Sequence, residues 1–386
     1  MTREFKEASI QSSVAERPAV AIAEKLASEI SNAADEIDRL RRLPDDLVSS
    51  LKAAGAFRLL IPGEFGGLGV ELPDFVDALS IFAQADASVA WCVSQGAVIA
   101  TTSLWLPEAS TRELWLDPDT AIANGPPRGC EATQTPDGLS VTGNWGFSSG
   151  CQHATWMHGA VRRVADGAWL GVYFPKEQAR FHDNWQVAGL RGTGSFEFSV
   201  DGLSVPDEWV TDFRIAPIDD AVVYKIPTGL IFAVSFAAVA VGVARASLDA
   251  TIDLAQGKVP GYAKQTVRDD PDMQKFIGEA EMRWHAARAY LHETVASVCS
   301  EIGSKITDAQ RIALRMTGTH VIRESAAVVN LAYTVAGSSA IYQDNPLQRR
   351  YQDMQVITQH VQARMSHYGF VGRYFLGHPF QPGPLN

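Results

Sequence analysis

The sequence has few of the features that mark secreted, membrane-bound or nucleic-acid-binding proteins. It holds only four cysteines in 386 residues, and no two of them form a Cys-x-x-Cys pair. A disulfide framework is therefore not expected. Acidic residues outnumber basic ones by 44 to 33, which gives a net charge of −11 and disfavours nucleic acid or a membrane surface as a partner. The polar N-terminus has no apolar signal-peptide region, so we expect a cytoplasmic protein.

Motifs that bind nucleotides or metals are also missing. Two segments, 67–69 and 192–194, each read Gly-x-Gly. Each supplies only half of a dinucleotide fingerprint, and neither lies between a parallel strand and a helix. Cys151 and His153 alternate along the chain, but two ligands do not make a metal site, and we expect His153 to be structural. The sequence therefore predicts no metal and no site for NAD(P)H.

One long apolar run, residues 226–244, is nearly uncharged and about long enough to span a bilayer. It contains Pro227, Gly229, Ser235 and many alanines. This composition favours a helix buried on all sides of a bundle that also packs against other subunits. We therefore expect no membrane span.

The apolar periodicity divides the chain into three parts. Spacing of three and four residues predicts helices up to about residue 117, a period of two predicts strands between about 120 and 212, and helical spacing returns after 219. The capping box Thr307-Asp308-Ala309-Gln310 predicts the start of a long helix that runs to Ala336. We predict an α+β chain with an N-terminal helical domain (1–118), an antiparallel β-barrel or sandwich domain (119–214) and a C-terminal helical bundle (215–386).

The most distinctive stretch is residues 145–156, which reads Trp-Gly-Phe-Ser-Ser-Gly-Cys-Gln-His-Ala-Thr-Trp. It predicts a strand, a sharp polar turn and a second strand. Gly150 lets the backbone pass close to a flat ligand. The letters of 146–150 match the Gly-x-Ser-x-Gly nucleophile elbow, but that motif needs a helix directly after the serine. A serine hydrolase is therefore disfavoured.

Together with Trp185 and residues 189–195 (Gly-Leu-Arg-Gly-Thr-Gly-Ser), this stretch resembles the acyl-CoA dehydrogenase superfamily. The resemblance covers about residues 17–377 and implies an N-terminal helical domain, a middle antiparallel β domain and a C-terminal four-helix bundle around a flavin. Dehydrogenases of this superfamily often read Ile-Tyr-Glu-Gly-Thr-Ser, with the glutamate as base. This chain has Gln343 there, and an amide is no general base. An acyl-CoA dehydrogenase would need the displaced Asp344, and it remains the alternative.

Three segments resemble the two-component monooxygenase branch of the superfamily, the aromatic hydroxylases. They are residues 147–153, residues 189–195, and residues 345–349 (Asn-Pro-Leu-Gln-Arg) with 358–360 (Thr-Gln-His). The resemblance implies that reduced flavin and O₂ form a C4a-hydroperoxide, which oxygenates a small aromatic substrate of phenolic, indolic or heteroatom-bearing type. Reduced FMN is expected, with FAD possible, delivered by a separate NAD(P)H-dependent flavin reductase. A homotetramer is also implied.

The resemblance also assigns site residues. Ser149 matches the position at flavin N5 and is expected to hold the N5 proton, whereas His360 is expected to act as acid or base on the substrate. Substrate contacts are expected from Trp91, Gln95 and His360. Flavin contacts are expected from Asn124, Phe147, Ser148, Ser149, Trp185, Thr193, Ser195, Lys264 and Ser338.

Two further expectations concern the flavin phosphate and the type of aromatic substrate. Lys264 and Ser338 are expected at the flavin phosphate, Lys264 possibly across a subunit boundary. Several phenol-hydroxylating relatives carry a histidine shortly after the Ala-Trp pair, where this chain has Gln95. An indole, an amine or a sulfur heteroatom therefore fits this pattern as well as a phenol does. A non-catalytic binding or scaffold subunit is the remaining alternative.

Overall fold

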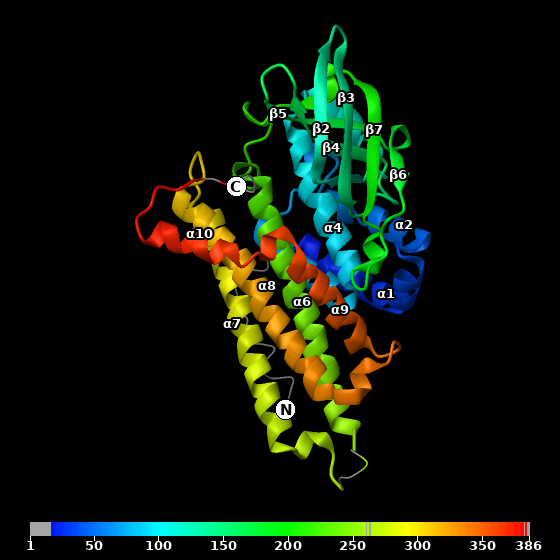
Figure 1. Cartoon of the computed structure of the whole chain (residues 1–386), viewed down its shortest axis with the longest axis vertical. Helices are drawn as coiled ribbons and strands as arrows, with labels where there is room; N and C mark the ends of the chain where they lie inside the picture. Colours follow the sequence, from blue (N-terminus) through cyan, green and yellow to red (C-terminus); the bar gives the residue numbers. More distant parts are fainter. Residues whose placement is uncertain (1–16, 260, 262–263, 382, 384–386) are drawn as a thin grey trace.

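The computed structural model describes residues 17–259, 261, 264–381 and 383. It shows a β sheet flanked by helices, from which a long helical bundle projects (Figure 1). Helices therefore begin and end the described chain, and the sheet lies between them in sequence. This helical, β, helical order is the one that the apolar periodicity predicts.

The N-terminal part is helical because its apolar residues share one face of each helix. In the first helix Leu26, Ile30 and Ile37 are buried, at the spacing of one helical face. Asp86 caps the fourth helix by accepting from the backbone N–H groups of Ser88 and Val89. These helices are α1 (Pro18–Leu40), α2 (Asp45–Ala53), α3 (Leu72–Ala85), α4 (Ala87–Ala100) and α5 (Glu108–Leu116).

The middle part forms one eight-stranded sheet in the order β6-β7-β3-β2-β4-β5-β8, with β1 paired to β4. Most pairings are antiparallel, as predicted. The strands are β1 (Ile122–Gly125), β2 (Pro127–Thr135), β3 (Gly138–Ser148), β4 (Trp156–Arg163), β5 (Trp169–Pro175), β6 (Arg180–His182), β7 (Phe196–Val205) and β8 (Val210–Thr211).

Residues 145–156 form the expected strand, turn and strand, but the two strands do not pair with each other. Strand β2 lies between them, so residues 149–155 cross over β2 and do not close a hairpin. As a result, β4 runs parallel to β1 and to β2, with Ile122 opposite Trp156 and Glu131 opposite Arg162. The crossover takes Ser149 off the edge of the sheet and towards α4.

The C-terminal part consists of helices whose ends follow local signals. The predicted capping box at Thr307 and Gln310 is present, and Asn345 caps the helix that begins at Pro346. Helices α6, α7 and α8 run side by side along the projecting bundle (Figure 1). The helices are α6 (Thr228–Gly257), α7 (Pro271–Glu301), α8 (Asp308–Ala336), α9 (Pro346–Gln359) and α10 (Ser366–Phe375).

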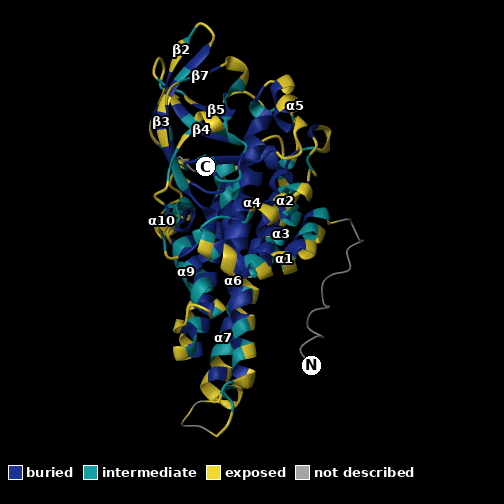
Figure 2. Cartoon of the chain, turned by 90° about the vertical axis from the view of Figure 1, so that its right-hand side faces the viewer, coloured by how far each residue is buried: buried dark blue, intermediate teal, exposed yellow. Residues whose placement is uncertain are grey.

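Two helical segments, Ala87–Trp105 and Thr228–Gly257, are long and apolar enough to cross a membrane. Their most apolar windows are 94% and 83% buried within this chain, and both helices lie in its interior (Figure 2). They are core helices. Because α6 is covered by helices of its own chain, its burial gives no support to the expected packing against other subunits.

His158 on β4 is a buried polar residue with an energetic cost. Its ring meets Tyr173 edge-on at 4.9 Å between centroids, and neither ring nitrogen has a hydrogen-bond partner in the described part of the chain. Burial lowers the pKa of His158 to about 4. The unfolded chain therefore binds a proton at this residue between about pH 6.5 and pH 4, where the folded chain does not.

We predict that this histidine weakens the fold in acid. Stability is fully present above the unfolded pKa and is lost as the pH falls towards 4, by about 2 kcal/mol at pH 5. His158→Leu should remove this loss, measured as the free energy of urea unfolding at pH 5 and pH 7.5. His285→Leu, which changes an exposed histidine, is the control. An unchanged pH dependence in His158→Leu would contradict this assignment.

Candidate functional site

A buried chain of hydrogen bonds joins three hydroxyl groups and an indole where α4, the turn after β3 and the loop before β7 meet. Trp91 Nε1 donates to Ser149 Oγ at 3.1 Å. Ser149 Oγ lies 2.7 Å from Ser195 Oγ, which lies 2.7 Å from Thr193 Oγ1. Thr193 Oγ1 donates to the Leu190 carbonyl at 2.8 Å. We call these five residues the hydroxyl chain.

The hydroxyl chain has a direction. A carbonyl oxygen only accepts, so the Thr193 proton is committed to Leu190. All four contacts are hydrogen bonds only if Ser195 donates to Thr193 and Ser149 donates to Ser195. Ser149 Oγ then has its own proton engaged and one lone pair occupied by Trp91. Its remaining lone pair can accept a hydrogen bond from a ligand N–H.

This arrangement fits the group that the sequence predicts. The N5 atom of a reduced flavin carries a proton and donates, whereas N5 of an oxidised flavin accepts. The buried Ser149 oxygen, with its own proton already used, suits the reduced form. Trp91, Ser149, Ser195 and Thr193 are all buried, which keeps water from competing for these bonds.

His360 lies against the other side of this site, at the end of α9. Its ring meets the rings of Trp91 and Phe236 edge-on, at 5.3 and 4.7 Å between centroids. Trp91 and Phe236 are themselves stacked at 3.9 Å. Trp91 therefore contacts both predicted catalytic residues, Ser149 through its N–H and His360 through its ring.

The protonation state of His360 follows from its surroundings. Burial, with the nearby Arg364 cation, lowers its pKa to about 4, so the ring is neutral at pH 7. Nδ1 accepts the backbone N–H of Gln362 at 3.3 Å, which places the single proton on Nε2. Nε2 makes no hydrogen bond to another described residue, so its N–H is free to meet a substrate.

Gln95 and Asn124, two further predicted site residues, contact each other. Gln95 lies one turn after Trp91 on α4 and therefore on nearly the same helix face. Its Nε2 donates to Asn124 Oδ1 on β1 at 2.6 Å. Both residues are half-buried. The pair leaves the Gln95 carbonyl and the remaining N–H groups of both amides beside Trp91, and together they form a neutral recognition surface.

Phe147 is an aromatic residue in an unusual position. Its φ is 53°, in the left-handed region that costs a non-glycine residue roughly 1 kcal/mol or more. Its side chain is 57% exposed, with the Trp185 ring edge-on at 6.2 Å and the Arg128 guanidinium 5.2 Å from the ring centre. An exposed ring on a strained backbone is a feature of ligand sites, in keeping with its predicted flavin contact.

The predicted residues around Phe147 lie in two different environments. The Trp185 side chain is buried, and its Nε1 donates to the Leu190 carbonyl at 3.2 Å, so it shares an acceptor with Thr193. Ser148 is fully buried beside the Cys151 thiol and makes no bond to the hydroxyl chain. The surroundings of the Ser148 hydroxyl group therefore show no route for its predicted contact with a flavin.

Two predicted phosphate ligands are not brought to the hydroxyl chain. Lys264 is exposed in the loop between α6 and α7, at the end of the bundle remote from the sheet (Figure 1). Ser338 is exposed in the 3₁₀ turn Gly337–Ile341 that follows α8. Neither residue is among the described hydrogen-bond partners of the hydroxyl chain, and their expected role at the flavin phosphate stays a prediction.

The alternative base is also absent from this site. Gln343 and Asp344 are exposed in the turn before α9. Among the described residues, no carboxylate hydrogen-bonds to Ser149, Trp91 or His360, and no group of three potential metal ligands is found. His153, expected to be structural, packs its ring against Phe57 at 4.9 Å, and burial lowers its pKa to about 3.

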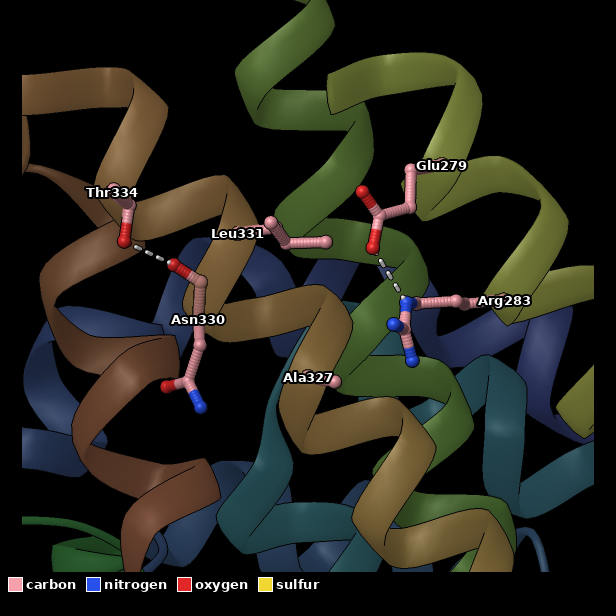
Figure 3. Close-up of a pocket in the computed structure, with 6 residues that line it drawn as sticks. All are labelled: Glu279, Arg283, Ala327, Asn330, Leu331 and Thr334. Carbon is pink, nitrogen blue, oxygen red and sulfur yellow. Dashed lines mark hydrogen bonds and ion pairs between the residues drawn. The ribbon is translucent and has the colours of Figure 1, made fainter. Parts of the chain in front are cut away.

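A surface hollow of about 310 Å³ lies elsewhere, between α7 and α8 (Figure 3). On one side of it Arg283 donates to the Glu279 carboxylate. On the other side the Thr334 hydroxyl donates to the Asn330 backbone carbonyl. None of the predicted site residues lines this hollow. It has no visible connection to the hydroxyl chain.

Two residues of the site were missed from the sequence. Phe236 lies inside the apolar run of α6, where nothing distinguishes it from core residues. Asp353 lies on α9 and accepts the Leu190 N–H with Oδ1 at 2.6 Å. The sequence marks Asp353 only as an acidic residue that lies seven residues before His360.

Comparison with known proteins identifies relatives over most of the chain. The acyl-CoA dehydrogenase N-terminal domain matches residues 19–118, and the acyl-CoA dehydrogenase C-terminal domain matches residues 234–365. The indole-3-acetate monooxygenase of Pseudomonas putida is 31% identical over 359 residues, which cover 91% of each chain.

A further relative and a solved structure also match most of this chain. The flavin-dependent monooxygenase, oxygenase subunit HsaA, of Rhodococcus jostii (strain RHA1) is 31% identical over 337 residues, which are 83% of this chain and 88% of that protein. The crystal structure of 3-HSA hydroxylase from Rhodococcus sp. RHA1 has a TM-score of 0.88 at 27% identity and covers 95% of this chain and 98% of that one.

The protonation state of His360 can be measured directly. We predict that His360 stays neutral from pH 8 down to about pH 5 and gains a proton only near pH 4. Side-chain NMR of histidine-labelled protein gives the titration, and His360→Asn identifies the resonance. A His360 midpoint between pH 6 and 7 would show that the ring is solvated and would contradict the packing described here.

Proposed function

The chain belongs to the acyl-CoA dehydrogenase family, and we propose that it is the oxygenase component of a two-component flavin-dependent monooxygenase. It uses reduced flavin and O₂ to place one oxygen atom on a small aromatic substrate, and the second oxygen leaves as water. The observation that carries this proposal is the double contact of Trp91. One indole joins Ser149, whose oxygen can offer a ligand only an acceptor, to His360, whose free Nε2 carries a proton.

The cofactor is reduced FMN, or FAD, which supplies two electrons and activates O₂ when bound. Ser149 Oγ holds the proton at N5, because its remaining lone pair accepts and its own proton is engaged by Ser195. Trp91 and Ser195 fix the orientation of that oxygen. The burial of these groups excludes water and stray bases that would remove the N5 proton.

The substrate is proposed to lie between His360 and the Gln95–Asn124 pair. His360 Nε2–H donates a hydrogen bond to an oxygen of the substrate or of the reacting group. The amide pair offers no charge for a phenolate. An indolic or heteroatom-bearing aromatic therefore suits this surface as well as a phenol does.

The proposed partners follow from what the chain lacks and exposes. A separate NAD(P)H-dependent reductase supplies the reduced flavin, since the sequence has no complete dinucleotide fingerprint. We also propose a cytoplasmic homotetramer, in which Lys264 and Ser338 meet the flavin phosphate of another copy. Large apolar side chains exposed near the C-terminus, such as Phe375 and Leu376, support association; light scattering of the purified protein gives the mass.

Ser149→Ala tests the proposed role of the hydroxyl chain. Loss of the N5 acceptor should raise the ratio of H₂O₂ released to product formed about tenfold, as one hydrogen bond is worth roughly 1.5 kcal/mol. The protein is mixed with chemically reduced FMN, O₂ and a panel of indoles and phenols. Product is measured by chromatography and H₂O₂ by a peroxidase assay.

Ser204→Ala, which removes an exposed hydroxyl on β7, is the matched control and should keep the wild-type ratio. A Ser149→Ala protein with an unchanged ratio would remove Ser149 from the proposed mechanism. The dehydrogenase alternative would be favoured by a wild-type protein that forms no oxygenated product. Its bound oxidised flavin would then be bleached by an acyl-CoA.

A further inference from the structure

Asp353 is a buried carboxylate that contacts the loop of the hydroxyl chain from the opposite side. It lies on α9, is 4% exposed, and its Oδ1 accepts the Leu190 backbone N–H at 2.6 Å. Among the described residues, this hydrogen bond is the one that joins a charged side chain of the C-terminal part to the loop 189–195. A buried carboxylate is costly unless it makes such bonds. The hydrogen bond from Leu190 therefore offsets part of the free-energy cost of burying Asp353.

Leu190 is the point at which this contact can act on the site. Its φ is 49°, in the left-handed region, and the hydrogen bond from its N–H offsets the strain of that conformation. Its carbonyl accepts from the Thr193 backbone, the Thr193 hydroxyl and the Trp185 indole. One peptide group on each side of Leu190 thus connects Asp353 to the end of the hydroxyl chain.

The loop also holds the turn that carries Ser149. The Gly150 N–H donates to the Thr193 carbonyl at 2.9 Å, in addition to the bond between Ser195 and Ser149. A displacement of Leu190 therefore moves the acceptor of Thr193 and, through it, the partner that takes the Ser149 proton. The direction of the hydroxyl chain depends on the position of this loop.

The loop 189–195 packs so closely against α9 that its position there is fixed. A Cβ atom at Gly189 would lie 2.1 Å from the Gln352 carbonyl oxygen, so only glycine lets the backbone approach the helix this closely. Asp353 follows Gln352 directly. The glycine and the carboxylate therefore fix the same contact from its two sides.

The hydrogen bond from Leu190 to Asp353 can form in either protonation state of the carboxyl group. Burial, with the Asp86 carboxylate of the α4 cap, raises the pKa of Asp353 to about 7, and the Leu190 N–H and the nearby Arg349 oppose this rise. Arg349 in turn pairs with Asp35 at 2.7 Å. A carboxylate oxygen and the carbonyl oxygen of a carboxylic acid both accept from an N–H, so the bond to Leu190 does not need a negative charge.

The same helix presents His360. His360 is the C-cap residue of α9, seven residues after Asp353 and about 10 Å from it along the helix axis. A rigid helix thus contacts the loop behind Ser149 with one side chain and Trp91 with the other.

We propose that Asp353 is the positioning residue for Ser149: its buried oxygen holds Leu190 in the left-handed turn and so fixes the loop whose hydroxyl groups orient the Ser149 oxygen. The proposal rests on the proposed function of Ser149. Asp353 contacts neither substrate nor cofactor, and it acts through Leu190, Thr193 and Ser195.

Two substitutions separate the acceptor from the charge. Asp353→Asn keeps an oxygen acceptor and should behave as wild type, whereas Asp353→Leu has similar volume and no acceptor. In Asp353→Leu the Leu190 amide should exchange hydrogen about tenfold faster, as expected for the loss of one such bond. Hydrogen exchange of peptides that span residues 187–195, read by mass spectrometry in protein without flavin, gives this rate.

The second readout is the ratio of H₂O₂ to product with reduced FMN. It should rise in Asp353→Leu and stay at the wild-type value in Asp353→Asn. Because Asp353 acts through Ser149, the double variant Asp353→Leu/Ser149→Ala should be no more uncoupled than Ser149→Ala alone. Ratios that multiply in the double variant would overturn the proposal, as would an Asn variant that matches the Leu variant.

Gly189→Ala covers the case in which Asp353→Leu does not fold. Its added Cβ pushes the loop away from α9, so it should expose the same amide and raise the same ratio. A Leu190 amide that stays protected in both variants overturns the proposal. An amide that is exposed in them while Ser149→Ala remains fully coupled supports the role of Asp353 in holding the loop and refutes the role of Ser149 instead.

Discussion

The site depends on one constraint: a buried hydroxyl group must give its proton to an acceptor. The Leu190 carbonyl ends the hydroxyl chain and cannot donate, so it sets the direction of every bond back to Trp91. Ser149 is left with an oxygen that can accept from a ligand but whose proton is in use. The proposed preference for reduced flavin, and the proposed protection of its N5 proton, follow from that single fixed direction.

The fold serves this constraint by bringing its three parts to one point. Trp91 comes from α4 of the N-terminal part, Ser149 and Ser195 from the ends of β3 and β7, and His360 from α9 of the C-terminal part. The crossover of residues 149–155 takes Ser149 off the sheet edge, and the close approach at Gly189 seats the loop on α9. Each part alone would leave the hydroxyl chain open to water.

Local signals in the sequence predicted much of the fold. The capping box at Thr307 and Gln310 is a property of a few adjacent residues, so it could be read directly, and it is confirmed. The resemblance drew attention to Ser149, Thr193 and Ser195, which the structure places in bonding contact. Their roles at a flavin stay predictions.

Long-range features could not be predicted in the same way. The separation of β3 from β4 by β2, and the parallel pairings of β4 that follow from it, depend on which strands meet in space. Phe236 looks like any other apolar residue of α6, and Asp353 acquires its meaning only through Leu190, 163 residues away. Lys264 and Ser338 were assigned to the flavin from their positions along the sequence, but a single chain does not place them at Ser149.

The most direct test of the directed hydroxyl chain is the affinity for FMN in its two redox states. Anaerobic titration calorimetry of the wild-type protein should show that reduced FMN binds about tenfold or more tightly than oxidised FMN, since N5–H meets an acceptor only in the reduced form. Ser149→Ala should abolish most of this preference, and Ser204→Ala should keep it. Equal affinities for the two forms in the wild-type protein, or a preference that survives Ser149→Ala, would contradict the account.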